Sequence, residues 1–230
     1  AQTAAALFSH YNSVKAQAVP CSELYFHPQL YIGSGETLVC PITRKSVTTE
    51  VRLAIKRVHE FPNAQSLAIT CCSGSREYNE DMILSSDANE DSVVMTKSFT
   101  SMVYLAVIMA MYVGGKRDEI AAMANYGDSA RDALQRMDDL ARRIIAGHEH
   151  LNLFITLGQG IYYGVANECM NKMKEMGLSN SEAYYSLEYR HGPMSLVDEN
   201  TLIIFLSHSA TVQEDAKLLR QMKEYGAVTL

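Results

Sequence analysis

Apolar runs that suit buried strands alternate along this chain with segments that suit helices. The strand-like runs cover 37–43, 66–72, 151–160 and 201–208, and helix-like segments separate them. This alternation is typical of α/β proteins, in which helices connect parallel strands. The chain is therefore expected to be an α/β protein that binds ligands at the carboxyl ends of its strands.

The same plan occurs twice, which predicts two lobes. Residues 1–113 are expected to form the first lobe and 151–230 the second, with a charged, helical linker at 114–150. The chain begins inside a helical pattern and stops on strand-like residues. The chain is therefore expected to be a fragment that is cut at both ends.

Composition argues against several classes of function. The net charge is −6 with no basic stripe, which argues against nucleic acid as a partner. The most apolar run, 102–113, is too short to cross a bilayer. The five cysteines lack the paired spacing of a zinc site or a disulfide framework, which favours a reducing cytoplasm. No cluster of metal-ligating residues stands out, so no metal or other cofactor is expected.

The segment 168–193 contains the strongest candidates for chemistry. Glu168, Lys172 and Glu175 stand at i, i+4 and i+7, so a helix points all three in one direction. His191 precedes a Gly-Pro pair that breaks regular structure. A carboxylate, an ammonium and an imidazole offer a base, a charge stabiliser and an acid that titrates near neutrality. On spacing alone, a solvated helix face followed by an ordinary turn is the more frequent explanation.

The same segment resembles the second half of the sugar isomerase (SIS) family. This family includes the isomerase domain of glucosamine-6-phosphate synthase, stand-alone phosphosugar isomerases and fructosamine-6-phosphate deglycases. The resemblance extends over nearly the whole chain and implies two doubly wound parallel-sheet lobes, each a three-layer αβα sandwich. It also implies that both lobes are incomplete here: the first would lack its first strand and loop, and the second its last strands. The matched positions are Glu168, Lys172, Glu175, Glu182, Ala183, Tyr184, Glu188, His191, Gly192 and Pro193.

The resemblance also implies a role for each side chain. Glu175 would be the general base that moves a proton between C1 and C2 of an open-chain sugar phosphate. Lys172 would stabilise negative charge on the enediol oxygens. His191 would assist ring opening, and because the equivalent histidine of relatives can come from a neighbouring subunit, a homodimer is expected. Glu168 would hold Lys172, and Glu188 would orient the turn.

Phosphate binding is expected in the loop at 43–49. The run SGET at 34–37 looks like the family's Ser-x-Ser-Gly-Glu-Thr loop, but it precedes a strand and so lies at the wrong end of the sheet. The loop at 43–49 departs from the family pattern, because Lys45 replaces a serine and Ser46 replaces the glycine that lets a ligand approach. Its hydroxyls and cations could still hold a phosphate; an ordinary polar turn is the alternative. The candidate residues are Thr43, Lys45, Ser46 and Thr48.

Glu90 and the segment 95–100 resemble a second family pattern, Ser-Thr-Lys-x-Phe-Thr, with Met95 in the first position. In relatives this region helps to close the sugar-phosphate site. Thr96 and Lys97 are therefore further candidates for substrate binding. The alternative is that these residues cap the long helix that follows.

Together these features predict a phosphosugar isomerase or deaminase without a glutaminase domain, acting by proton transfer on a small-molecule sugar phosphate. A fructosamine-6-phosphate deglycase abstracts a proton in the same way, so these residues do not separate the two. The altered loop favours a different class, a non-catalytic sugar-phosphate-binding module that regulates a partner. The joint presence of Glu175, Lys172 and His191 argues against that class.

Overall fold

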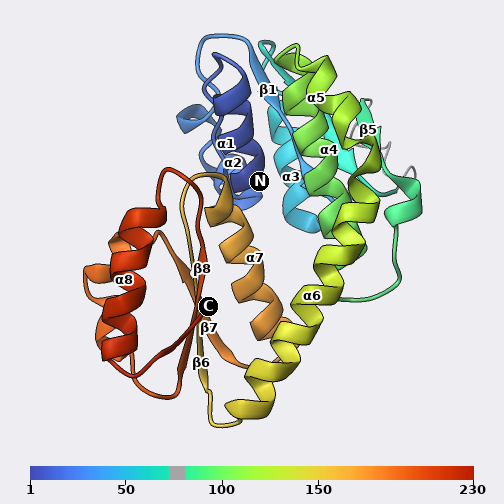
Figure 1. The fold of residues 1–230 in the computed structure, drawn as a ribbon. Coiled ribbons are helices and arrows are strands. Elements are labelled where there is room, and N and C mark those ends of the chain that lie inside the picture. Colours follow the sequence, from blue (N-terminus) through green and yellow to red (C-terminus); the bar gives the residue numbers. More distant parts are fainter. Residues whose placement is uncertain (73–80) are drawn as a thin grey trace. The chain divides into compact units, whose positions relative to one another are not determined.

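The computed structural model describes residues 1–72 and 81–230, which form two compact units (Figure 1). Unit 1 extends from Thr3 to Gly114, and unit 2 from Gly115 to Leu230. All pairings between the described strands are parallel, and helices connect the strands. The predicted α/β class is therefore confirmed. None of the helices in the described ranges has the length and apolar character needed to cross a membrane.

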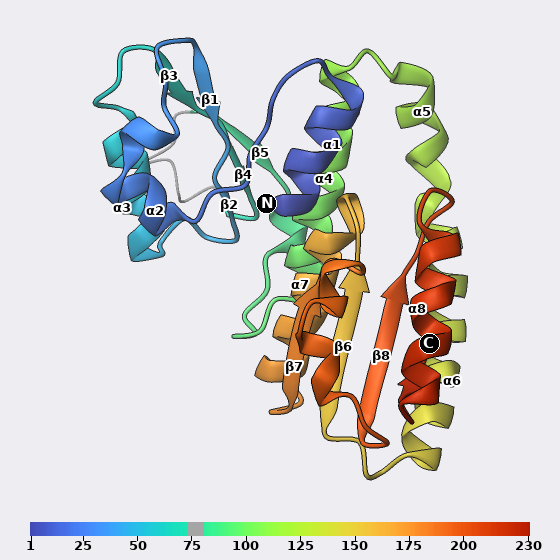
Figure 2. The same ribbon diagram turned by 90° about the vertical axis from the view of Figure 1, so that its left-hand side faces the viewer.

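Unit 1 is built on short parallel ladders with helices on both sides (Figure 2). Its elements are α1 (Gln2–Tyr11), α2 (Cys21–Phe26), η1 (Pro28–Leu30), β1 (Thr37–Val39), β2 (Ile42–Thr43), α3 (Thr49–Val58), β3 (Ala64–Ser66), β4 (Ala68–Thr70), β5 (Met82–Leu84), η3 (Ser86–Ala88) and α4 (Lys97–Val113). β1 pairs with β3, and the order of the other three strands is β2-β4-β5. Phe8 and Met102 pack α1 and α4 in one core cluster, and Leu24 and Val58 pack α2 and α3 in another.

The strands of unit 1 differ in detail from the prediction. The predicted strand at 37–43 is interrupted before Pro41, which has no N–H to donate to a ladder. Ile69 N nevertheless donates to Pro41 O at 2.9 Å, so pairing continues past the break. Strand β5 was not predicted from the sequence.

Unit 2 contains a four-stranded parallel sheet in the order β7-β6-β8-β9. Its elements are α5 (Arg117–Ala122), η4 (Met123–Asn125), α6 (Tyr126–Gly147), β6 (Leu153–Gly158), α7 (Ile161–Glu175), β7 (Asn180–Tyr184), η5 (Glu188–Arg190), η6 (Pro193–Leu196), β8 (Thr201–Leu206), α8 (Val212–Glu224) and β9 (Val228–Thr229). The chain runs outward from β6 to β7 in one direction and from β8 to β9 in the other. Right-handed crossovers then place α7 and α8 on opposite faces of the sheet, as Figure 1 shows. The order of the strands therefore reverses between β6 and β8, the position where such sheets bind ligands.

The core of unit 2 lies between this sheet and α8. Leu157 and Ile203 from the sheet, and Leu218 and Met222 from α8, are all fully buried. Tyr189 from η5 joins the same cluster. The edge strand β7 was not predicted, because its sequence, NSEAY, is largely polar and has no apolar run to mark it.

Leu218→Ala is expected to lower the free energy of unfolding by about 2–5 kcal/mol, because the smaller side chain leaves a cavity between α8 and the sheet. Urea denaturation followed by circular dichroism measures the change. Val212→Ala is the matched control on the same helix, since Val212 is 49% exposed. Equal losses in the two variants would contradict the packing described for α8.

Candidate active site

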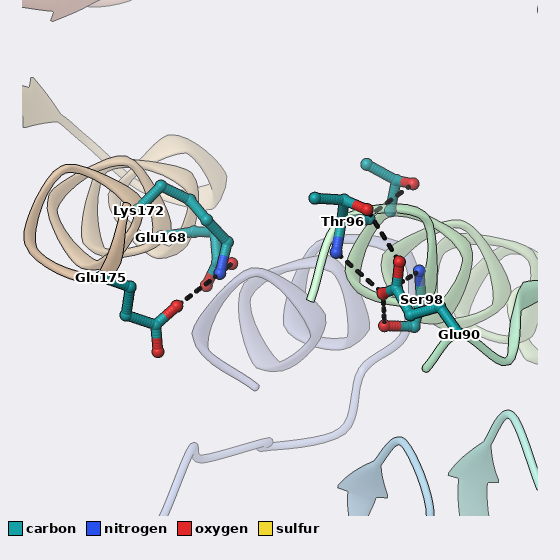
Figure 3. Close-up of polar contacts among 7 residues, drawn as sticks. Glu90, Thr96, Ser98, Glu168, Lys172 and Glu175 are labelled. Atoms are coloured by element: carbon teal, nitrogen blue, oxygen red, sulfur yellow. Dashed lines mark hydrogen bonds and ion pairs between the residues drawn. The ribbon is translucent and has the colours of Figure 1, made fainter. Parts of the chain in front are cut away.

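The candidate proton-transfer residues lie on α7, in unit 2. Lys172 Nζ is 2.8 Å from Glu168 Oε1 and 3.0 Å from Glu175 Oε2, so one ammonium lies between two carboxylates (Figure 3). The prediction that a helix points these three side chains in one direction is therefore confirmed. The helix begins after Gly160, whose φ of +55° favours glycine, and it packs Ala166 into the interior.

Burial differs along this row of charges. The side chains of Glu168 and Lys172 are 18% and 22% exposed, whereas that of Glu175 is 42% exposed. Burial alone would lower the pKa of Lys172, but the hydrogen bonds and charges of both carboxylates outweigh it and raise that pKa. Of these three side chains, Glu175 is thus the one most accessible to solvent.

The pKa of Glu175 lies below its usual range. The hydrogen bond from Lys172 is the main cause of this lowered pKa. Partial burial of the carboxylate raises the pKa and so opposes the shift, whereas a second hydrogen bond, from the Asn171 amide, lowers it further. Glu175 is therefore ionised at neutral pH and able to accept a proton. Asn171 was not among the sequence-predicted residues, although its i, i+4 spacing from Glu175 could have indicated it.

His191 lies in the turn between η5 and η6. Its backbone N–H donates to Glu188 O at 3.0 Å, so Glu188 contributes to the turn through its carbonyl group. Gly192 has φ +124°, a conformation that favours glycine. The His191 side chain is exposed, and within the described ranges no hydrogen bond or ion pair joins it to Glu175. The structure thus brings Glu168, Lys172 and Glu175 together, but not His191 or the Glu188 side chain.

The predicted phosphate loop follows β2, in unit 1. Thr43 Oγ1 accepts a hydrogen bond of 3.2 Å from Ser46 N, which closes the loop. Ser46 has φ +53°, the left-handed region that glycine prefers, so serine adopts the conformation expected where the family has glycine. Ser46 is 2% exposed, and its hydroxyl finds no hydrogen-bond partner in residues 1–72 or 81–230. Lys45 is half-buried, whereas Thr48 is exposed and directly precedes α3.

Thr96 and Ser98 bind Glu90 in a cluster at the start of α4 (Figure 3). Glu90 accepts hydrogen bonds from Thr96 N at 2.8 Å, from Thr96 Oγ1 at 2.7 Å and from Ser98 N at 3.2 Å, and also from the Ser98 hydroxyl. Lys97 Nζ donates to Asp87 O at 3.1 Å. These contacts match the capping alternative, since Glu90 satisfies backbone N–H groups that the first turn of a helix leaves unpaired.

The Glu90 cluster predicts an acid-sensitive contribution to stability. Hydrogen bonds from Ser98 and Thr96 outweigh the opposing effect of partial burial and lower the pKa of Glu90 to about 2 from an ordinary value of 4.5. A lowered folded-state pKa stabilises the fold above the unfolded value, and this stabilisation is lost as pH falls from 4.5 toward 2. In Glu90→Gln this pH-dependent contribution to the stability of the fold should be absent.

Urea denaturation between neutral and acidic pH measures this effect. The gap in unfolding free energy between the unmodified chain and Glu90→Gln should be widest above pH 4.5 and should narrow below it. Glu224→Gln, in the last turn of α8, serves as the control. A gap that stays constant as the pH falls would show that Glu90 is not held ionised by this cluster.

The sequence-predicted residues therefore belong to two units. Unit 1 holds Thr43, Lys45, Ser46, Thr48, Thr96 and Lys97, and unit 2 holds Glu168, Lys172, Glu175, Glu188 and His191. Neither unit shows a cluster of three or more His, Cys, Asp or Glu side chains arranged for a metal ion, among the residues that the structure describes. What this arrangement offers chemically is an ionised base beside an ammonium in one unit, and a buried unpaired hydroxyl in the other.

Comparison with known proteins identifies relatives of this chain. Residues 152–230 match the family model described as SIS domain. The glutamine–fructose-6-phosphate aminotransferase (isomerizing) of Halobacterium salinarum is 30% identical over 203 residues, which cover 84% of this chain and 34% of that protein. A putative D-galactosamine-6-phosphate deaminase of Escherichia coli is 26% identical and is covered over 56% of its length. The chain thus spans between about a third and a half of these curated relatives.

Solved structures agree with this assignment. Glucosamine-6-phosphate deaminase from Thermotoga maritima superposes with a TM-score of 0.84 at 26% identity, covering 100% of this chain and 70% of that one. The C-terminal domain of glucosamine-fructose-6-phosphate aminotransferase from Francisella tularensis has a TM-score of 0.86 over 99% of this chain and 66% of its own, at 21% identity. At that identity the second match supports the fold alone. By the match of residues 152–230, the shared fold and these relatives, the chain is similar to SIS-domain proteins.

Proposed function

We propose that this chain is an enzyme of the phosphosugar isomerase or deaminase type, which transfers a proton on an open-chain sugar phosphate. The observation that carries the proposal is the position of Lys172 between Glu168 and Glu175, with Glu175 ionised and more exposed than its neighbours. Relatives named as an isomerizing aminotransferase and as amino-sugar-phosphate deaminases support the same class.

In this proposal Glu175 removes a proton from the carbon next to the carbonyl group. The C–H electron pair forms the C=C bond of an enediol, and the carbonyl electron pair moves to its oxygen. Lys172 stabilises the negative charge on that oxygen, while Glu168 keeps the ammonium in place. The remaining hydroxyl proton of this enediolate then moves to the charged oxygen, and Glu175 returns its proton to the former carbonyl carbon, so that the new carbonyl group lies on the carbon that was deprotonated first. His191 opens the sugar ring as an acid, and Glu188 orients the turn that carries it.

The loop at 43–49 holds the phosphate group in this proposal. The buried Ser46 hydroxyl supports this role, because a polar group without a partner costs about 1–3 kcal/mol and a phosphate oxygen would satisfy it. Thr43, Lys45 and Thr48 supply the remaining hydroxyls and charge. Thr96 and Lys97 close the site, in addition to their contacts at the start of α4.

Ser46→Ala separates this role from a structural one. Removing a hydroxyl that has no partner should leave the free energy of unfolding unchanged or slightly higher. It should weaken binding of a sugar phosphate about tenfold, the loss of one charge-assisted hydrogen bond. Calorimetric titration and urea denaturation of the same variant measure both quantities. Lower stability with unchanged binding would show that Ser46 serves the loop alone.

We further propose that the protein is a cytoplasmic homodimer. In each subunit, residues 114–150 link the two lobes, and His191 acts in the active site of the neighbouring subunit. Two alternative functions would use the same candidate residues. A fructosamine-6-phosphate deglycase would use the same proton abstraction and release an amine. A sugar-phosphate-binding regulator would use the loop at 43–49 without turnover, which the replacement of the loop glycine by Ser46 favours.

The test is to incubate the chain with ketose and aldose 6-phosphates, with 2-amino sugar 6-phosphates and with fructosamine 6-phosphates. Interconversion of ketose and aldose identifies an isomerase, ammonia release a deaminase, and amine release a deglycase. Saturable binding without turnover identifies the regulator. The sugars without phosphate are the controls, and an absence of both binding and turnover would overturn the proposal.

A further inference from the structure

Two histidines lie close together where α6 ends and the chain turns toward β6 (Figure 1). The ring centroids of His148 and His150 are 5.9 Å apart, with an angle of 53° between the ring planes. His148 is half-buried and His150 is exposed. Both belong to unit 2, and the hydrogen bonds of both rings lie within that unit. The proposed reaction uses neither of them.

A backbone carbonyl group determines which nitrogen of each ring carries the proton. His148 Nδ1 lies 3.0 Å from Ile144 O. His150 Nε2 lies 3.1 Å from Glu199 O. A carbonyl oxygen only accepts hydrogen bonds, so each of these two nitrogens must be protonated and donate. In the neutral rings, the lone pairs that can bind a metal are then on His148 Nε2 and His150 Nδ1.

Both the hydrogen bonds and the spacing of this pair suit a shared metal ion. A histidine that binds a metal almost always donates its other ring N–H to a carbonyl or carboxylate group, which orients the ring and makes the binding nitrogen more basic. Because zinc lies about 2.0–2.1 Å from a histidine nitrogen, the centroids of two imidazoles around one tetrahedral ion are about 5–6 Å apart. The separation of His148 and His150, 5.9 Å, lies in that range.

The backbone that carries the two histidines is held by hydrogen bonds. Leu151 N donates to His148 O at 3.2 Å, which closes a turn over 148–151. Asn152 N donates to Asn200 O at 2.9 Å and so ties this turn to the segment before β8. Two ligands that the backbone already holds close together lose less conformational entropy on binding than two ligands on a mobile segment.

The residues next to the pair favour a cation, and the ligand type indicates which one. Glu149 directly follows His148, and Glu199 provides the carbonyl group that His150 binds; both glutamates are exposed. Their negative charge attracts a cation. Imidazole nitrogen suits zinc, copper and nickel, whereas magnesium and calcium prefer oxygen ligands.

We infer that His148 and His150 together bind one divalent transition-metal ion of the zinc type. Water completes the coordination, because two protein ligands are fewer than the four of a closed structural zinc site, and the ion is therefore exchangeable. The bound ion joins the end of α6 to the turn before β6 and, through the bond from His150 to Glu199 O, to the segment before β8. It therefore stabilises unit 2. This inference does not depend on the proposed reaction.

Calorimetric titration of the 230-residue chain with Zn²⁺ tests the site. His148→Gln and His150→Gln should each weaken binding of this ion about tenfold or more, because each removes one of its two protein ligands. His59→Gln is the matched control, since His59 is also exposed and its Nε2 lies 3.3 Å from Ser66 Oγ, and it should leave binding unchanged. All variants keep the five free cysteines, so zinc bound to thiols contributes equally to each. Mg²⁺ should give no heat of binding that depends on the two histidines.

Two further measurements do not rely on binding heats. NMR of the histidine ring nitrogens in the unmodified chain should show zinc shifting the signals of His148 Nε2 and His150 Nδ1, while the other nitrogen of each ring keeps its proton. Urea denaturation with and without zinc should show a higher free energy of unfolding when the ion is present. This gain should be smaller in His148→Gln and in His150→Gln than in His59→Gln. Circular dichroism checks that the variants are folded.

Three results would overturn the inference. The first is zinc binding of unchanged affinity and stoichiometry in folded His148→Gln or His150→Gln, which would place the ion elsewhere. The second is the loss of one bound ion in each single variant while another ion still binds the remaining histidine with unchanged affinity, which would show that the two rings bind separate ions. The third is a lack of change in the ring-nitrogen signals of both histidines at saturating zinc, which would show that neither is a ligand.

Discussion

Replacing Lys172 with methionine is expected to lower phosphosugar turnover by about 10²–10³-fold, the effect of removing one group that stabilises a developing oxyanion. Methionine keeps most of the length of the side chain but removes the ammonium that lies between Glu168 and Glu175. Binding of the substrate should change much less than turnover, because the charge on the oxygen develops during proton transfer.

The same variant should also shift the dependence of kcat/KM on pH. The hydrogen bond from Lys172 is the main cause of the lowered Glu175 pKa, so its loss should raise that pKa toward the usual range. A base must be ionised to act, and the acidic limb of the profile should therefore move to higher pH. If Lys172 had only a structural role, Lys172→Met would change the free energy of unfolding without moving the acidic limb of the kcat/KM profile.

Lys217→Met provides the control for both effects. Lys217 forms an ion pair with Glu214 on α8, also three residues apart, but the pair is exposed and lies outside the candidate site. Its loss should change neither turnover nor the pH profile, and stability only slightly. Equal effects in the two variants would contradict the role proposed for Lys172.

The helix face of α7 could be predicted from the sequence because the 3.6-residue period fixes directions along a helix. Glu168, Lys172 and Glu175 needed no tertiary information to be placed together. The strongly apolar strands β6 and β8 were equally predictable. The edge strand β7 was not, because a strand at the rim of a sheet buries too little surface to need an apolar run.

Contacts between residues far apart in the sequence could not be predicted from residue spacing. The bonds from Thr96 and Ser98 to Glu90 depend on how the chain between them folds back, and residue spacing does not specify that path. The conformation of Ser46 illustrates the same limit. A non-glycine residue at φ +53° follows from the closure of the loop by Thr43, which only the structure reveals.

Proton transfer by Glu175 is the central claim, and the entry of solvent deuterium into the substrate tests it most directly. In deuterium oxide, the unmodified chain should exchange the hydrogen at C1 or C2 of its sugar phosphate, followed by proton NMR. Glu175→Gln has the same shape without the base, so exchange should slow by about 10²–10⁴-fold while binding is retained. Glu214→Gln on α8 should exchange at the unmodified rate. Exchange in Glu175→Gln at an unchanged rate, with equal substrate saturation, would contradict the account.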